Sequence, residues 1–293
     1  MAIRKGKDVV GSFKNHVFRK WRDINVVQSA PGEGGVKQTD ATKKSSLVFG
    51  LASNLARNIR DMFSFFILKL YDGSNNNRMT TLLRSILEKC LDKSTNTYTF
   101  VQDSFDRLNG LELNTNSPLT ESMMVIPTSS YKDGIITINF PELINNQQFI
   151  FPKETSSCTV VMGTESYRLE DSTVSRGRQT HQFEVDNQQQ LIEKQSFEFK
   201  VPNGCLCIVG ITLHYHKNNL YGKNLINNKT LNPAAICAAI VTPGDFEIDP
   251  ELYWTKPVWK PVGKAYKKIP KAKIKVTSGK SATTDQASPR SQP

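Results

Sequence analysis

The sequence predicts an α+β protein, in which helical and β-rich segments follow one another along the chain. Apolar residues recur at steps of three and four over residues 43–71 and again over residues 79–91, which is the spacing of amphipathic helices. Short apolar segments separated by turn residues fill residues 118–241, which is typical of antiparallel strands. Residues 255–293 combine Lys, Pro, Ser and Gln with few apolar residues, and they predict an extended tail.

The N-terminal residues have the pattern of a β-hairpin. Residues 8–13 and 16–21 are extended segments joined by a polar turn, and residues 24–27 form a third extended piece. Within residues 16–21, odd-numbered and even-numbered side chains should face opposite sides of the strand. We expect Trp21 to pack on Phe13.

Two helices are expected to follow the hairpin. Residues 43–71 place seven apolar side chains on one continuous face. These are Val48, Ala52, Leu55, Ile59, Met62, Phe66 and Leu70. Asp72-Gly73 should end this helix, and a second amphipathic helix is expected over residues 79–91. A short polar turn between two such helices predicts an antiparallel pair. Residues 97–113 are expected to add a short helix, and their alternating tail at residues 111–113 is a candidate start of a strand.

The chain becomes β-like after Pro118. The expected strands are Met123–Pro127, Gly134–Phe140, Ser157–Met162, Tyr167–Leu169, His181–Val185, Ser196–Lys200, Cys205–His216 and Ala235–Val241. Their spacing favours an antiparallel β-sandwich of the immunoglobulin-like kind. Residues 205–216 are the most apolar segment, so their strand should be central.

These elements divide the chain into four expected segments. Residues 1–36 form a hairpin arm, residues 37–117 a helical segment, residues 118–248 the β-sandwich, and residues 249–293 a basic, largely disordered tail. The tail composition offers little apolar area to offset the entropy of ordering.

The net charge of +11 is concentrated at the two ends of the chain. Residues 1–23 carry seven Lys and Arg against two Asp, giving +5, and residues 255–293 carry ten against one, giving +9. The residues between them therefore sum to 11 − 5 − 9 = −3. The sequence thus predicts a near-neutral body with two basic ends, so any binding to polyanions should reside in the ends.

Aromatic residues and lysines interleave in the tail. Lysines that neutralise phosphates and rings that stack on bases suit a sequence-tolerant nucleic-acid contact. The candidate contacts are Lys260, Lys264, Tyr266, Lys267, Lys268, Lys271, Lys273 and Lys275. The alternatives are a tail that lies on a protein partner, with Trp254 and Trp259 as anchors, and a tail that makes no defined contact.

A metal site and a catalytic site both lack support. Cys205, Cys207, His214 and His216 are residue types that bind zinc. On one strand, however, the two pairs point to opposite faces and are too far apart for one ion to reach both. The sequence has no Gly-x-Ser-x-Gly, Walker A or Gly-x-Gly-x-x-Gly strand–helix motif. We therefore expect no metal, no cofactor and no enzymatic activity.

The sequence also bears on the compartment. The five cysteines are too sparse for a disulfide framework. The N-terminus lacks the apolar region of a secretory signal, and no apolar run approaches the roughly 18–20 residues of a membrane span. A reducing, cytoplasmic location is the expectation.

The segment from Gly11 to Pro31, GSFKNHVFRKWRDINVVQSAP, resembles the opening of an uncharacterised family of Bacteroidota proteins. Members begin with a glycine-punctuated hairpin, a Trp followed by a basic residue, an apolar strand and a Pro. Residues 37–39 and Phe49 are similar to the linker and helix that follow, and residues 197–215 are similar to the strands near the end of the family pattern.

The resemblance implies an architecture and a source rather than a site. It implies an N-terminal hairpin, a helical segment, a C-terminal β-sandwich and a bacterial origin, and the family carries no established activity. The chain departs from the pattern at Asn15, His16 and Asp23, where the family has glycines.

A non-enzymatic structural or protein-interaction protein is the function that these features favour. Phe13 and Trp21 in the hairpin and Trp254 and Trp259 in the tail are the expected partner contacts, either with another protein or in self-assembly. A nucleic-acid-associated protein acting through residues 254–275 is the alternative, and its binding should weaken steeply with salt.

Overall fold

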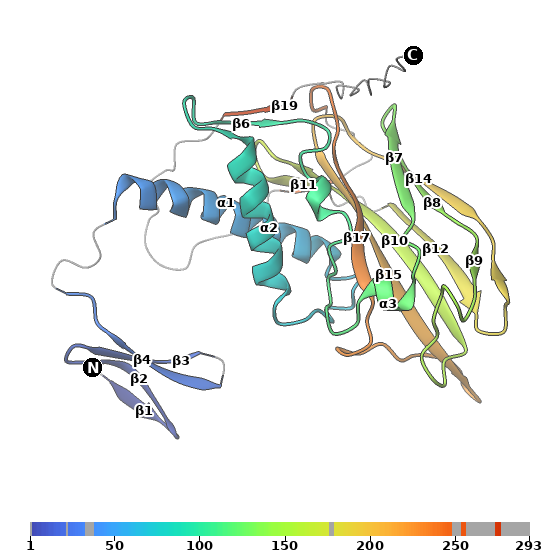
Figure 1. Ribbon diagram of the computed structural model, residues 1–293, viewed down its shortest axis with the longest axis horizontal. Helices are drawn as coiled ribbons and strands as arrows, with labels where there is room; N and C mark the ends of the chain where they lie inside the picture. The colour runs from blue at the N-terminus through green and yellow to red at the C-terminus, as the bar shows by residue number, and fades with distance from the viewer. Residues whose placement is uncertain are drawn as a thin grey trace, which may run out of the picture. The chain divides into compact units, whose positions relative to one another are not determined.

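A computed structural model describes residues 2–21, 23–32, 38–175, 179–247, 253–255 and 273–276 (Figure 1). The chain divides into two compact units, residues 1–47 and residues 48–293. Helices and antiparallel sheets are both present, which confirms the mixed helical and β-rich class predicted from the sequence.

The first unit contains a four-stranded antiparallel sheet in the order β1-β2-β3-β4. Its strands are β1 (Ile3–Lys5), β2 (Asp8–Phe13), β3 (His16–Trp21) and β4 (Ile24–Ser29). The predicted hairpin and third extended piece are β2, β3 and β4, and β1 was not expected. Lys14 has a positive φ of 49° at the β2–β3 turn, where the polar turn was predicted.

The strand register separates the two aromatic residues of the predicted hairpin. Phe13 is paired with His16, and Trp21 is paired with Ile24. Since His16 and Trp21 differ by an odd number along β3, Phe13 and Trp21 lie on opposite faces of the sheet. The expectation that Trp21 packs on Phe13 is therefore wrong, and a strand period of two is the physical reason.

Two long helices follow, α1 (Asp40–Phe63) and α2 (Asn75–Cys90). The seven-residue apolar face predicted for the first helix is buried up to Phe66, but the helix ends eight residues before residue 71. Leu68 and Lys69 have positive φ values of 53° and 58°, so the chain leaves the helix in a tight turn. This turn brings Phe66 onto the sheet.

The predicted helix over residues 97–113 is mostly wrong. Residues Leu91–Asp92 (β5) and Thr97–Phe100 (β6) are strands, and only Asp106–Leu108 form a single 3₁₀ turn. Tyr98 and Phe100 alternate with more exposed residues and are both buried, with ring centroids 6.0 Å apart. Burial of alternate side chains favours a strand over the helical pattern.

The second unit is built around one large antiparallel sheet. Its strands are β10 (Ser157–Arg168), β11 (Thr173–Ser175), β12 (Gln179–Asp186), β15 (Leu206–Asn219), β16 (Gly222–Leu225), β17 (Ala234–Val241) and β18 (Trp254–Thr255). β15 lies between β10 and β17, which confirms that the most apolar segment is central. The strands predicted at residues 157–162 and 167–169 are one continuous strand.

A smaller antiparallel sheet has the order β14-β8-β7. Its strands are β7 (Thr128–Lys132), β8 (Ile135–Phe140) and β14 (Gln195–Lys200), and a separate ribbon joins β9 (Leu143–Ile144) to β13 (Leu191–Ile192). The strand predicted at residues 123–127 is wrong. A short helix, α3 (Leu119–Ser122), comes directly before these residues. The Met123 amide donates to the Leu119 carbonyl of this helix at 2.7 Å, so the first amide of the expected strand is not available for strand pairing.

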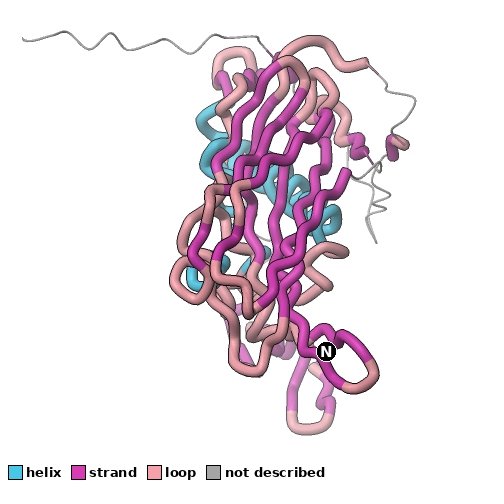
Figure 2. Tube along the Cα trace, turned by 90° about the vertical axis from the view of Figure 1, so that its right-hand side faces the viewer, coloured by secondary structure: helices cyan, strands magenta, loops and turns pink. Residues whose placement is uncertain are grey.

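The large sheet is the middle layer of the second unit. Even-numbered side chains of β15, such as Ile208, lie in one core with the helices, and odd-numbered ones, such as Val209, lie in another with β8 and β14. Figure 1 shows α1 and α2 on one side of this sheet, and Figure 2 looks onto the strands with the helices behind them. Both faces of β15 are therefore buried, which explains its continuous apolar sequence.

Two facing glycines make room for the end of α1 and the turn after it. Gly163 of β10 is the register partner of Gly210 of β15, in the centre of the large sheet. A Cβ atom at Gly163 would lie 2.2 Å from the Phe66 ring, and one at Gly210 would lie 2.6 Å from the Phe63 ring. The two rings are 6.0 Å apart, so this glycine pair sets where the helix layer meets the sheet.

Candidate interaction surface

The N-terminal sheet exposes large apolar side chains. Five of them are between 56% and 61% exposed: Ile3, Phe13, Trp21, Ile24 and Val27. None of the described residues between 2 and 47 is buried. The predicted contact residues Phe13 and Trp21 are therefore both on the surface of the first unit.

The exposed side chains lie on both faces of this sheet. The pairs Trp21–Ile24 and Phe18–Val27 are three register positions apart on β3 and β4, so they have opposite parity. Phe13 shares the parity of Phe18, because Phe18 is paired with Gly11. One face thus carries Trp21 and Ile24, and the other carries Phe13, Phe18 and Val27.

A sheet of this kind lacks a core of its own. Strands of a stable sheet bury at least one face against another element, and about 30 residues are too few to form a core without help. Residues 1–32 also carry seven Lys and Arg against Asp8 and Asp23, so their net charge is 7 − 2 = +5. The N-terminal sheet is therefore basic and carries exposed apolar side chains on each face.

The tail residues predicted as contacts fall into three groups. Trp254 is half-buried in β18, pairs with β11 and packs edge-to-face on Phe246 at 4.9 Å. Phe246 in turn lies 4.5 Å below the Arg168 guanidinium. Lys273 and Lys275 belong to the backbone strand β19 (Lys273–Val276). The remaining residues, which are Trp259, Lys260, Lys264, Tyr266, Lys267, Lys268 and Lys271, lie outside the described residues.

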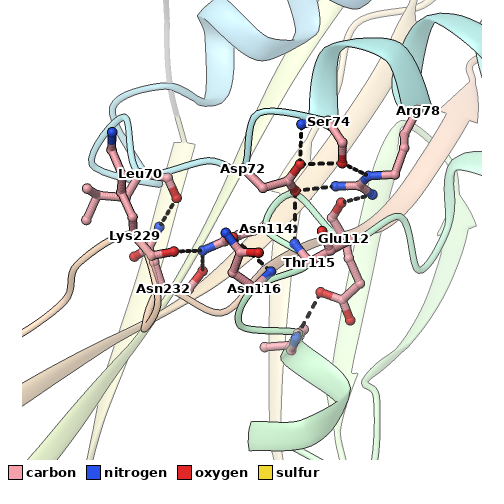
Figure 3. Close-up of polar contacts among 11 residues, drawn as sticks. Leu70, Asp72, Ser74, Arg78, Glu112, Asn114, Thr115, Asn116, Lys229 and Asn232 are labelled. Atoms are coloured by element: carbon pink, nitrogen blue, oxygen red, sulfur yellow. Dashed lines mark hydrogen bonds and ion pairs between the residues drawn. The ribbon is translucent and has the colours of Figure 1, made fainter. Parts of the chain in front are cut away.

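A buried ion pair locks the turn between α1 and α2 (Figure 3). The Asp72 carboxylate accepts from the Arg78 guanidinium at 2.6 Å, from the Ser74 amide at 2.6 Å and from the Thr115 amide at 2.9 Å. Burial alone would raise the pKa of Asp72, but these hydrogen bonds outweigh it and hold the pKa well below its usual range. Arg78 also donates to the Glu112 carbonyl at 2.8 Å.

Neighbouring amides extend this network to the sheet (Figure 3). Asn232 donates to the carbonyls of Ile67 and Leu70 at 2.9 and 3.1 Å, and Asn114 donates to the Lys229 carbonyl at 3.1 Å. Every one of these contacts is internal to the protein. The network holds the turn after α1 in place, and its carboxylates are used in structural hydrogen bonds rather than presented to a substrate.

The four residues considered for zinc are divided between the two faces of β15. Cys205 and Cys207 are buried in the core on the side of the small sheet. His214 donates from Nε2 to the Phe66 carbonyl at 2.8 Å on the helix side, and burial lowers its pKa. His216 hydrogen-bonds through Nε2 with the Thr159 hydroxyl at 3.1 Å. Among the described residues no group of three or more His, Cys, Asp or Glu side chains gathers as metal ligands.

Thiol reactivity should follow burial. Cys158, Cys205, Cys207 and Cys237 are buried and Cys90 is half-exposed. Burial raises the pKa of Cys207 to about 12, so its reactive thiolate is scarce. We expect a thiol reagent to modify one cysteine quickly in the folded chain and all five after denaturation. Mass spectrometry should locate the fast site at Cys90, and rapid modification of a second cysteine would contradict the arrangement.

An open groove lies at one end of the two packed sheets. It has a volume of about 1020 Å³ and is lined by Gln102, the β7–β8 turn, residues 201–203, Pro243, Gly244 and Glu247. Its charged lining consists of Lys132, Asp133 and Glu247.

The chain matches no protein-family model, no curated protein and no solved structure. The likeness of residues 11–31 to a Bacteroidota family accordingly stays a prediction. None of the helices within the described ranges combines the length and the hydropathy needed to cross a membrane.

Proposed function

We propose that this chain is a non-enzymatic structural protein that self-assembles by docking its N-terminal sheet on a second copy. The observation that supports this function is the exposure of apolar side chains on both faces of a sheet in which no described residue is buried. Covering either face removes apolar area from water at about 25 cal/mol per Å², which favours association.

The charge distribution favours a second copy as the occupant. Residues 1–47 carry ten Lys and Arg against four Asp and Glu, giving +6, and residues 48–254 carry 18 against 22, giving −4. The sheet of one copy therefore meets a surface of opposite average charge when it docks on the body of another. Two sheets that met face to face would instead repel each other.

Sedimentation velocity of the full chain tests this proposal. We expect concentration-dependent association at micromolar protein that persists at about 0.5 M salt, because salt screens the charge attraction but not the burial of apolar area. Trp21→Ser should weaken association by about 30-fold or more, which corresponds to the roughly 2 kcal/mol that truncating an interface aromatic costs. Phe13→Ser reports on the opposite face of the sheet in the same way.

A matched control uses an exposed aromatic of the second unit. Tyr221 is 97% exposed at the tip of the β15–β16 hairpin, so Tyr221→Ser changes surface hydrophobicity without touching the N-terminal sheet. Its association should equal that of the unmodified chain. An association constant that neither Trp21→Ser nor Phe13→Ser lowers, or a chain that stays monomeric throughout, contradicts the proposal.

Nucleic-acid binding through the lysine-rich tail is the alternative. Adding DNA or RNA to the same protein samples tests it. A basic segment binds DNA or RNA with an affinity that falls steeply with salt, and deletion of residues 255–293 would abolish such binding. Binding of that kind together with a monomeric chain would favour the alternative. The immunoglobulin-like topology of the sheets and the cytoplasmic location also remain proposals.

A further inference from the structure

A strand from the C-terminal part of the chain extends one edge of β6. β19 runs parallel to β6, with Lys273 opposite Thr97 and Val276 opposite Phe100. On the other edge, β5 pairs with β6 at only two positions and in the antiparallel sense. The order of this small sheet is therefore β19-β6-β5, with a parallel partner that arrives over a long connection.

The β6 edge is a rigid template. Its alternate side chains Tyr98 and Phe100 are buried in the helix-side core, and Phe100 also contacts Phe105 with ring centroids 5.4 Å apart. The side chains fix the strand from within, while the edge of β6 opposite β5 presents the backbone that pairs with β19. A fixed edge of this kind is a ready acceptor for an added strand.

Charge favours a lysine-rich strand at this edge. Residues 88–106 carry four acids against two lysines, giving −2, and residues 256–280 carry nine lysines and no acid, giving +9. The opposite signs attract the segment to the edge and disfavour an acidic strand in the same position.

We propose that β6 is a strand-addition site that takes residues 273–276 of a second copy of this chain, so that neighbouring copies exchange their C-terminal strands. The backbone pairing seen between β19 and β6 is the same whether the strand comes from the same chain or from a neighbour. Exchange of an identical element needs no new contact, which makes it an inexpensive route to assembly.

The connection and the size of the strand both permit the exchange. Residues 256–272 separate β18 from β19, and 17 residues span up to about 60 Å when extended, which is enough to reach an adjacent molecule. The pairing involves four residues, so its release costs little compared with unfolding of the unit. This inference does not rest on the N-terminal sheet, because it uses a different surface.

Cross-linking between two different chains tests the exchange. Thr99 and Lys275 are register partners, and neighbouring strands lie about 4.8 Å apart, within the range of Cα separations that disulfides bridge. One chain would carry Thr99→Cys, and a second chain with a mass tag would carry Lys275→Cys. Both would carry Cys90→Ser to remove the half-exposed thiol, and Trp21→Ser to remove docking through the sheet.

Mild oxidation of the mixture should give a heterodimer on a non-reducing gel. Neither chain can form this cross-link within itself, so the heterodimer accumulates even when the exchanged form is a minor species. Ser288→Cys, 12 residues beyond β19, replaces Lys275→Cys as the control for random collisions. Adding Ile274→Pro, which removes a backbone donor from β19, should reduce the yield to that of the control.

The outcomes separate the two proposals. A heterodimer yield no greater than that of the Ser288→Cys control, or one that Ile274→Pro leaves unchanged, overturns strand exchange and leaves docking of the N-terminal sheet standing. A specific heterodimer in chains that carry Trp21→Ser supports strand exchange whatever the N-terminal sheet does.

Discussion

Gly163→Ala is expected to lower the free energy of unfolding of the second unit by about 2–3 kcal/mol, because the added methyl group overpacks a filled core. The new Cβ would lie 2.2 Å from Cζ of Phe66 and 2.5 Å from its Cε1. Phe66 cannot move away freely, since its ring packs on Phe63 and its carbonyl accepts from His214 at 2.8 Å. Thermal unfolding should therefore shift downward by about 5–10 °C.

A double-mutant cycle identifies the clash as the cause. Phe66→Ala alone removes a buried ring and should cost about 3–5 kcal/mol. In the double variant with Gly163→Ala the methyl group has room, so the combined loss should be smaller than the sum of the two single losses. Additive losses would contradict the contact between the glycine and the ring.

Gly50→Ala is the matched control for this substitution. Gly50 lies inside α1, and a Cβ there meets no atom within 4 Å. The same glycine-to-alanine change should therefore stabilise the chain by about 0.5–1 kcal/mol through helix propensity alone. Opposite signs at Gly50 and Gly163 would show that the loss comes from packing rather than from the substitution type.

This contrast also shows what the sequence could and could not predict. The helical spacing of α1 and the opposite parity of Cys207 and His214 on β15 depend on local periods of 3.6 and 2, and both are confirmed. The pairing of Gly163 with Gly210 joins residues 47 positions apart and depends on strand register, which no local pattern encodes. The sequence therefore placed Gly163 between two predicted strands, residues 157–162 and 167–169, although it lies inside the single strand β10.

The candidate interaction surface was partly predictable for the same reason. Alternation along β3 indicated that Trp21 is on one side of the strand, but only the pairing with β2 places Phe13 on the other face. The parallel pairing of β19 with β6 joins segments 176 positions apart, measured from Thr97 to Lys273, and their composition shows only that one is basic. Long-range strand pairing therefore determines which residues lie together in the N-terminal sheet and at the β6 edge, whereas composition determines only the charge of the two segments.

Asp72→Asn is expected to destabilise the second unit by about 2–4 kcal/mol. The substitution leaves the Arg78 guanidinium, whose side chain is largely buried, without this carboxylate, and it replaces one oxygen that accepts from the Ser74 or the Thr115 amide by an NH2 donor. Breaking a buried pair from one side costs this much because the remaining charge is uncompensated. Chemical denaturation of the full chain at neutral pH measures the loss.

The effect should depend on pH with a defined sign. The pKa of Asp72 is held well below its usual range in the folded chain, whereas an unfolded Asp titrates near about 3.9. The carboxylate therefore contributes its full stabilisation above about pH 4, and this contribution is lost as the pH falls toward the folded value. The difference in unfolding free energy between the unmodified chain and Asp72→Asn should be constant from about pH 5 to 7 and shrink below about pH 4.

Asp92→Asn separates burial from hydrogen bonding in this prediction. Hydrogen bonds from Ser94 and Thr95 lower the pKa of Asp92 to about 2, so it resembles Asp72 in titration, but its turn is exposed to solvent. Water can replace those hydrogen bonds, so Asp92→Asn should cost far less than Asp72→Asn. Equal losses at the two positions would mean that the Asp72–Arg78 pair gains nothing from its burial between the helix turn and the sheet.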